Sequence, residues 1–331
     1  MRRRGRVLPA AGGRGGGAPA HHRAGLGRPA VLAGPMGRRR TGTLLTGPGP
    51  SVGPGLVRLE AGLWVTAGRA AVVEGPDHLA LVDPGDEPWE AIERDLRRVE
   101  AETGKPLRWA LVTHAHPDHV ANLPLLLRDR PGVRVVAHEA SPVAADVRVA
   151  GEQRLPEVGP GVLAIPTPGH SDRGDDLAFF VPPHTLFSGD LVQPKGETWE
   201  EAFYPSPYPY FRDGDAYLGS LGRLERLPVD LLVTGHREIR RGAAARAWVR
   251  LTRRAIERLR QEALAWEGDE DPLVAGRDVF RRLCRERGIP AEAIEARLRR
   301  TNGPSAFERF DLPGFLWAWE IRSRISEDKG R

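Results

Sequence analysis

The chain has 331 residues, and 40% of them are apolar. This apolar fraction supplies a hydrophobic core and excludes a wholly disordered protein. The single cysteine, Cys284, excludes a disulfide framework and a cysteine-rich zinc module, and it predicts a reducing, cytoplasmic compartment in which this thiol only packs. No apolar run approaches the roughly 20 residues that span a bilayer, so we expect a soluble protein without a membrane partner.

The net charge of +5 is unevenly distributed. Residues 1–50 contain ten Arg, no acidic residue, 13 Gly and 6 Pro, so the remaining 281 residues carry 39 basic and 44 acidic side chains. The first 50 residues show no hydrophobic periodicity and are predicted to be a disordered tail. A basic arm for nucleic acid or membrane and a targeting peptide are alternatives, but we favour an over-extended translation start.

From about residue 57 onward, short strand patterns alternate with helical ones. Strands are predicted over residues 70–74, 79–83, 109–112, 133–136, 161–165, 177–181, 185–187 and 230–233. Helices are predicted over residues 89–102, 119–127 and 213–227, and the pattern beyond Gly242 is entirely helical. This order predicts an α/β domain of helix-covered sheets over residues 51–242 and a helical subdomain over residues 243–331.

The densest polar motif follows the predicted strand that ends at Val112 and contains His114, His116, Asp118 and His119. In an extended segment, residues i and i+2 point to the same side, so His114 and His116 are placed to grip one metal ion. Asp118 and His119 lie where the chain turns into a helix and are placed to face a second ion. Packing gives no reason for four polar groups at a strand end, so the motif indicates a metal site.

Three further candidate ligands stand at later strand ends: His170, Asp190 and His236. Five imidazoles and two carboxylates suit zinc, with manganese or iron as alternatives. A carboxylate can bridge two ions, which lie ~3.5–4 Å apart in two-metal sites, so we predict two divalent ions. The other histidines are predicted to be ordinary core or surface residues: His21, His22, His78, His138 and His184.

The ordered set resembles the signature of the metallo-β-lactamase superfamily, which is H-x-H-x-D-H followed by a His, an Asp and a last His at strand ends. The resemblance covers about residues 57–240 and implies an αββα sandwich with a metal site at one edge of two facing sheets. It implies that one metal is bound by His114, His116 and His170. It implies that the other is bound by Asp118, His119 and His236, with Asp190 as the bridge.

The resemblance also implies a mechanism, in which a metal-bridging hydroxide attacks an electrophilic carbonyl or phosphorus. Asp118 is then the catalytic residue that orients the hydroxide and passes a proton to the leaving group. Asp83, at an earlier strand end, matches an aspartate that orients the ligand histidines in this family.

The ligand set is closest to those of glyoxalase II-like hydrolases and of β-lactamase-like-protein-2-like endoribonucleases, which also have helical C-terminal regions. β-Lactam hydrolysis is disfavoured because no Cys accompanies Asp190. A lactonase is disfavoured because Leu191 stands where those enzymes tend to carry a Tyr. Persulfide dioxygenases share the scaffold but use one iron and fewer ligands.

All four tyrosines fall within 14 positions, residues 204–217, in a segment that follows Asp190 and is broken by Pro205, Pro207 and Pro209. Our hypothesis is that this stiff loop overhangs the metals and offers an aromatic wall to the substrate through Tyr204, Tyr208 and Tyr210. The alternative, which is about equally favoured, is a loop packed on the helical subdomain.

Two functional classes remain open. The acidic body and the aromatic loop favour hydrolysis of a small ester or thioester. A metal-dependent nuclease would need a basic stripe for phosphates, and residues 246–260 contain six Arg that are interrupted by Glu257. The ordinary interpretation of such a run is a solvated helix face, so nucleic acid is a less favoured partner. The sequence leaves the oligomeric state open.

Overall fold

The computed structural model describes residues 55–67, 69–159, 161–193, 206–236, 238–268, 271–303 and 306–329. All of them belong to one compact unit, Leu45–Arg331. The tail predicted over residues 1–50 lies outside the described residues. In the described part of the chain, no helix is both long and apolar enough to cross a membrane.

The first sheet has seven strands that are arranged in sequence order. They are β1 (Val57–Glu60), β2 (Leu63–Val65), β3 (Ala71–Glu74), β4 (Leu79–Val82), β5 (Leu107–Leu111), β6 (Arg134–His138) and β7 (Val147–Val149). The first four strands pair antiparallel, as the predicted hairpin between β3 and β4 requires, and β4 to β7 pair in parallel. The carboxyl ends of β4 and β5 therefore lie at the same edge of this sheet.

The second sheet has six strands in the order β13-β12-β11-β10-β9-β8. They are β8 (Gln153–Arg154), β9 (Leu163–Pro166), β10 (Leu177–Val181), β11 (Thr185–Phe187), β12 (Leu231–Val233) and β13 (Ile239–Arg241). Only β11 and β12 pair in parallel, which again brings two carboxyl ends to one edge.

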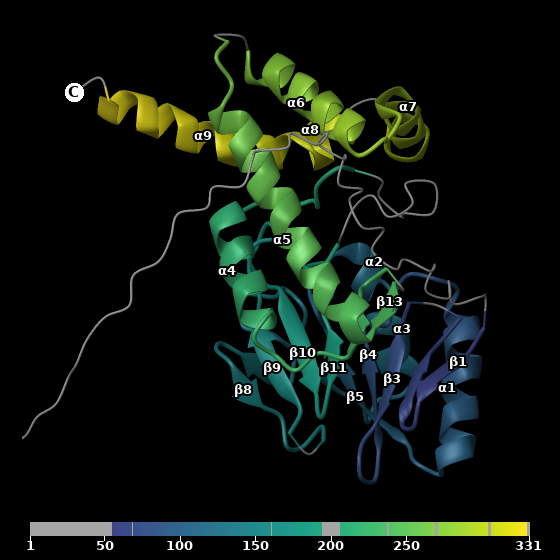
Figure 1. Cartoon of the computed structure of the whole chain (residues 1–331). Coiled ribbons are helices and arrows are strands. Elements are labelled where there is room, and N and C mark those ends of the chain that lie inside the picture. Colours follow the sequence, from purple (N-terminus) through teal and green to yellow (C-terminus); the bar gives the residue numbers. More distant parts are fainter. Residues whose placement is uncertain are drawn as a thin grey trace, which may run out of the picture. The chain divides into compact units, whose positions relative to one another are not determined.

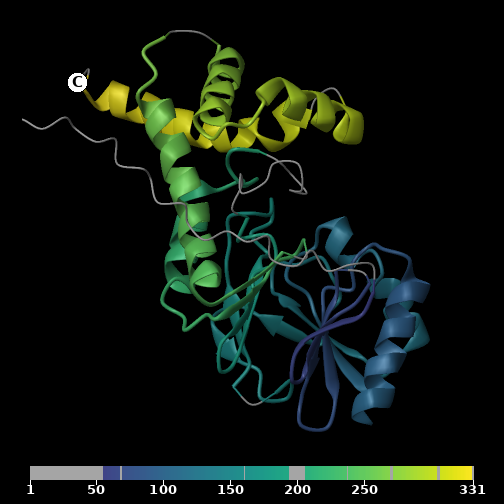
Figure 2. The same cartoon turned by 45° about the vertical axis from the view of Figure 1, so that its right-hand side comes forward.

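Alternation along the strands divides the apolar side chains between two faces of each sheet. Val73 of β3 and Phe179 of β10 pack together in the core between the sheets. Val72 instead faces the core beneath α1 (Trp89–Thr103), whereas Phe180 faces the core beneath the later helices. Figures 1 and 2 show the resulting layers, with helices on both outer sides of the paired sheets. The αββα fold class predicted from the sequence is confirmed.

The helices after the sheets extend the outer core of the second sheet. They are α4 (Gly214–Leu224), α5 (Gly242–Leu264), α6 (Pro272–Glu286), α7 (Ala291–Asn302), α8 (Ala306–Phe310) and α9 (Leu312–Lys329). Trp248 of α5 and Phe315 of α9 are buried in one continuous cluster with the outer face of the second sheet. Cys284 is buried in the same cluster, so its thiol packs as expected. The helical C-terminal region predicted from the sequence is therefore present.

One predicted helix is wrong. Residues 119–127 form parts of two helices, α2 (Pro117–Val120) and α3 (Leu123–Asp129). The side-chain amide of Asn122 donates to the carbonyls of Pro84 and Glu87, and a new helix begins at Leu123, with Pro124, which has no backbone N–H, in its first turn. The sequence does not predict β1, β2, β7, β8 or β13 as separate strands, since runs of two to four residues need not show the alternation that identifies a strand.

The burial of α5 gives a testable expectation for the outer core. Leu259 is fully buried, whereas Leu264 on the same helix is 36% exposed. We expect Leu259→Ala to lower the free energy of unfolding by about 2–5 kcal/mol, because it removes packed methyl groups and leaves a cavity. Leu264→Ala is the matched control and is expected to cost about 0.5 kcal/mol or less. Urea unfolding of both variants measures the difference, and equal losses would contradict this packing.

Candidate metal centre

Strand ends from both sheets supply the polar cluster. His114 and His116 follow β5 in the first sheet, and His170 follows β9 in the second. Asp190 and His236 follow the parallel strands β11 and β12. Asp118 and His119 lie on α2, which begins with Pro117 directly after His116. All seven predicted ligand residues are thus brought to one edge of the sandwich.

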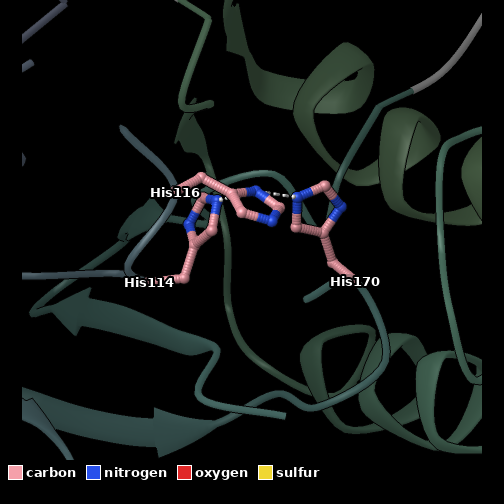
Figure 3. Close-up of side chains that lie close together, drawn as sticks. All are labelled: His114, His116 and His170. Atoms are coloured by element: carbon pink, nitrogen blue, oxygen red, sulfur yellow. Dashed lines mark hydrogen bonds between the residues drawn. The ribbon is translucent and has the colours of Figure 1, made fainter. Parts of the chain in front are cut away.

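Three histidines form the first group, and their side chains converge (Figure 3). His116 Nδ1 lies 2.9 Å from His114 Nε2 and 3.2 Å from His170 Nε2. One proton on His116 can satisfy only one of these two contacts. Nitrogens around a tetrahedral zinc ion lie about 3.3 Å apart, because Zn–N bonds are ~2.0–2.1 Å long. The spacing of the three nitrogens therefore fits a single cation.

Hydrogen bonds on the far side of two of these rings leave Nε2 without a proton. The Thr113 hydroxyl donates to Asp83 Oδ2 at 2.6 Å, so its oxygen accepts from His114 Nδ1 at 3.1 Å. His170 Nδ1 donates to the Tyr210 carbonyl at 3.1 Å. Because a neutral imidazole carries one proton, His114 and His170 both direct an Nε2 lone pair into the group.

A second group contains Asp118, His119 and His236, and Asp190 lies between the two groups. Asp190 Oδ1 is 3.4 Å from His119 Nε2, and Asp190 Oδ2 is 3.6 Å from His170 Nε2. Asp190 Oδ1 and His119 Nε2 are buried, and neither has a hydrogen-bond partner among the residues that the structure describes. Buried polar atoms that face each other without a partner fit a site built for a cation.

Asp83 accepts hydrogen bonds from the outer side of the cluster. Its Oδ1 accepts from the Thr113 amide at 2.8 Å, and its Oδ2 accepts from His119 Nδ1 at 2.8 Å. This carboxylate therefore orients His119 directly and His114 through Thr113. Asp83 adopts a φ of 49°, a left-handed conformation that aspartate tolerates better than most residues. The geometry matches the orienting position expected for Asp83.

Burial and neighbouring charges set the protonation of the cluster. Burial lowers the pKa of His170 to about 3 and holds the pKa of His114 well below its usual value, so both imidazoles are neutral. Burial opposes protonation of His119, but the carboxylates of Asp190 and Asp83 outweigh it and raise its pKa. Burial also opposes ionisation of Asp190, and His236 and His119 overcome it and lower its pKa. The carboxylate between the groups is therefore held as an anion.

The backbone approaches the cluster closely at Gly235. A Cβ added there would lie 2.3 Å from Asp190 Oδ1 and 2.5 Å from His119 Cε1. Any side chain at this position would enter the space that the two buried groups share. Gly235 is thus part of the site. The sequence alone could not identify this role, because a single glycine is compatible with many local structures.

The three tyrosines predicted to form an aromatic wall lie in different surroundings. Tyr204 lies outside the described residues. Tyr208 is 1% exposed, packs edge-on against Phe280 and donates its hydroxyl to the Asp311 carbonyl. Its ring is thus placed in the helical core, as in the packing alternative, and not toward a substrate. Tyr210 lies beside the first group, with its ring 5.2 Å from the His170 ring.

Sequence reasoning missed two contributors to the cluster, Thr113 and Arg69. Thr113 directly precedes His114, so its position was visible but its link to Asp83 was not. Arg69 Nη1 donates to Asp118 Oδ2 at 2.9 Å and lies 3.1 Å from His236 Nδ1. This arginine precedes β3 and is more than 40 positions from any ligand candidate, so only the folded chain reveals it.

The chain is similar in sequence to known proteins. The family model of the metallo-beta-lactamase superfamily matches residues 63–236, more than half of the chain. A hydroxyacylglutathione hydrolase from Stenotrophomonas maltophilia is 31% identical over 194 residues, which are 57% of this chain and 68% of that protein. A lactamase-like protein, aptB, from Emericella nidulans is 26% identical over 43% of this chain and 42% of its own length. The solved metallo-beta-lactamase from Pontibacter korlensis is 18% identical, with a TM-score of 0.46 over 61% of this chain and 98% of that one.

The chain therefore belongs to the metallo-beta-lactamase superfamily and is a hydrolase of that fold. Members of this superfamily bind divalent metals, mainly zinc, and the histidine and aspartate cluster described above is consistent with this property. The family resemblance inferred from the H-x-H-x-D-H motif is confirmed.

The close approach at Gly235 leads to a prediction about cation binding. We expect Gly235→Ala to weaken zinc binding about tenfold or more, because the new methyl group displaces Asp190 and His119. Gly219→Ala on α4 is the matched control, since an added Cβ there meets nothing within 4 Å. Zinc titration against a chromophoric chelator measures both variants. Wild-type affinity in Gly235→Ala would contradict the assigned position of the site.

Proposed function

We propose that the chain is a zinc-dependent hydrolase that cleaves a small thioester or ester. The convergence of His114, His116 and His170 on one point, with the anionic Asp190 beside them, carries this proposal. The similarity to the hydroxyacylglutathione hydrolase supports a thioester as the substrate class. In this proposal His114, His116 and His170 would hold one ion, Asp118, His119 and His236 would hold a second, and Asp190 would be shared between the two groups.

A divalent cation in this position would lower the pKa of water and polarise a substrate carbonyl. The residues of the chain supply the remaining functions. Burial opposes ionisation of Asp118, but the charges of His119, His236 and Arg69 lower its pKa and keep it a carboxylate. Asp118 can therefore orient the attacking water, accept its proton and pass that proton to the leaving thiolate.

We propose that Tyr210 forms the substrate-facing part of the aromatic wall. Its ring lies 5.2 Å from the His170 ring and 5.8 Å from the Phe310 ring of α8. The Arg212 guanidinium stacks over it at 5.0 Å. Tyr210 thus lies between the histidine group of the domain predicted over residues 51–242 and the helical subdomain predicted over residues 243–331. We propose that a small acyl group of the substrate would be held against the Tyr210 ring.

The described contacts lend less support to the nuclease alternative, which depends on the arginines of α5. Arg246 pairs with Asp230 at 3.1 Å, Arg253 with Glu225 at 2.8 Å and Arg258 with Glu286 at 2.7 Å. A phosphate backbone would have to compete with these carboxylates. The contacts therefore support a small-molecule substrate.

Removal of the metal tests the proposal. We expect the full chain, stripped of metal by a chelator, to lose hydrolysis of acyl-glutathione thioesters and to regain it when zinc is added. We expect His114→Ala to lower kcat/KM by at least about a hundredfold, because one of three ligands of the catalytic ion is lost. His184→Ala is the matched control, because His184 lies away from the site and pairs with Glu60.

The same assay compares the thioesters with oxygen esters and with a phosphodiester as alternative substrates. The Tyr210→Leu variant tests whether the Tyr210 ring contacts the substrate. The proposal predicts a higher KM for the thioester in Tyr210→Leu at unchanged zinc content. Thioester hydrolysis that persists in excess chelator, or faster cleavage of the phosphodiester than of every thioester, would contradict the proposed function.

A further inference from the structure

Helix α4 carries a row of side-chain donors that bind backbone carbonyls of other segments. Tyr217, Ser220 and Arg223 are spaced by three positions, so they are neighbours along one side of the helix. The Ser220 hydroxyl donates to the Pro168 carbonyl at 2.9 Å, and the Arg223 guanidinium donates to the Pro166 carbonyl. Both carbonyls belong to the end of β9 and the loop after it, which carries a histidine of the first group.

The hydroxyl of Tyr217 binds a different segment. It lies within hydrogen-bond distance of the Leu191 carbonyl and of the Asp190 carbonyl, which is 3.2 Å away, and it can donate to either. Tyr217 is fully buried, and Leu191 and Asp190 are 1% and 6% exposed, so water cannot replace this donor. The hydroxyl therefore holds the backbone of the residue that lies between the two ligand groups.

The backbone of α4 also contacts the loop after β9 directly. Gly169 has a φ of 132°, and an added Cβ there would lie 2.5 Å from the Tyr217 amide nitrogen. The Gly169 carbonyl accepts from the amides of Arg212, at 2.8 Å, and Asp213, at 3.2 Å, which directly precede the helix. Because Gly169 immediately precedes His170, the start of α4 and the position of His170 are fixed together.

The second sheet does not join these two ligand segments by itself. His170 follows β9 and Asp190 follows β11, but β10 lies between these strands. Strands two places apart in a sheet lie ~10 Å apart and share no hydrogen bond. Nevertheless, Asp190 Oδ2 lies 3.6 Å from His170 Nε2. The contacts of α4 with both segments account for this approach.

We propose that α4 sets the separation between His170 and Asp190, and that Tyr217 is the positioning residue for Asp190. This inference rests on the proposed metal site, to which both residues would belong. Without the hydroxyl, two buried carbonyls lose this donor, and the Asp190 segment shifts toward other donors. The Asp190 carboxylate then leaves its place between the ligand groups. Tyr217 acts only through the backbone, since its ring packs against Phe211.

A pair of matched tyrosine variants tests the proposal. Tyr217→Phe removes only the hydroxyl. Tyr208→Phe is the control, because Tyr208 is 1% exposed and donates to the Asp311 carbonyl in the helical core. Zinc titration of the metal-free full chains against a chromophoric chelator measures affinity. The visible spectrum of the cobalt(II)-loaded chains reports the number and geometry of the ligands.

We expect Tyr217→Phe to weaken zinc binding about tenfold or more and to change the cobalt spectrum. Tyr208→Phe should match the wild type in both measurements. With a thioester that the wild type hydrolyses, Tyr217→Phe should lower kcat about tenfold or more, while KM changes about twofold or less. Thermal unfolding of the metal-free chains checks that each variant is folded.

A second pair of variants tests the other end of the row and keeps the test decisive if Tyr217→Phe does not fold. Ser220→Ala removes the donor to Pro168, and alanine favours a helix. We expect it to weaken zinc binding, by less than Tyr217→Phe does. Ser323→Ala on α9 is its control, because the Ser323 hydroxyl donates to the Trp319 carbonyl of its own helix. Equal zinc affinities in these two serine variants would overturn the proposal.

Wild-type zinc affinity and an unchanged cobalt spectrum in a folded Tyr217→Phe variant would also overturn the proposal. Equal losses in Tyr217→Phe and Tyr208→Phe would do the same, because they would show a general loosening of the core. If the wild type still binds zinc and cleaves a thioester in these cases, the proposed function stands and only the role of α4 is wrong. If the wild type binds zinc but cleaves no thioester, the proposed substrate class fails, and zinc affinity and the cobalt spectrum still decide the role of α4.

Discussion

The constraint on which the site depends is the free-energy cost of burying imidazole and carboxylate groups whose lone pairs point at one another. His114 and His119 are each 1% exposed and Asp190 is 6% exposed, so water cannot satisfy them from outside. Buried polar atoms without partners destabilise a fold by about 1–3 kcal/mol each. The fold tolerates the cluster because Asp83, Thr113 and the Tyr210 carbonyl bind the outer sides of the rings. The inner sides of the rings have no such partners and are left for a cation. A bound cation would therefore stabilise the folded cluster as well as supply its chemistry.

The sequence predicts much of this arrangement because the central motif is local. His114, His116, Asp118 and His119 follow one strand and enter one helix, so spacing alone places them together. Parallel pairing then adds the more distant ligands, since β4 with β5 and β11 with β12 end at a common edge. The alternation of apolar residues likewise identifies the strands that build the core between the sheets. The family assignment follows from the order of these residues along the chain.

Features that depend on contacts between distant segments could not be predicted. Tyr208 and Tyr210 are two positions apart in the same loop, yet one is buried against Phe280 and the other faces His170. The break between α2 and α3 depends on the bonds of Asn122 to a loop more than 30 positions earlier. Arg69 reaches His236 across 167 positions. No pattern of hydropathy or spacing encodes such pairings, because they exist only after both sheets have formed.

Acceptors behind His114 and His170 draw the Nδ1 protons of both rings outward, so that Nε2 of each ring faces the three-histidine group without a proton. The location of the first bound ion is therefore the most direct measurement of the account. Anomalous diffraction at the zinc absorption edge, on crystals grown with one equivalent of zinc, should show one peak among His114 Nε2, His116 Nδ1 and His170 Nε2. A peak bound by Asp118 and His236 alone, or no peak at this edge of the sandwich, would contradict it.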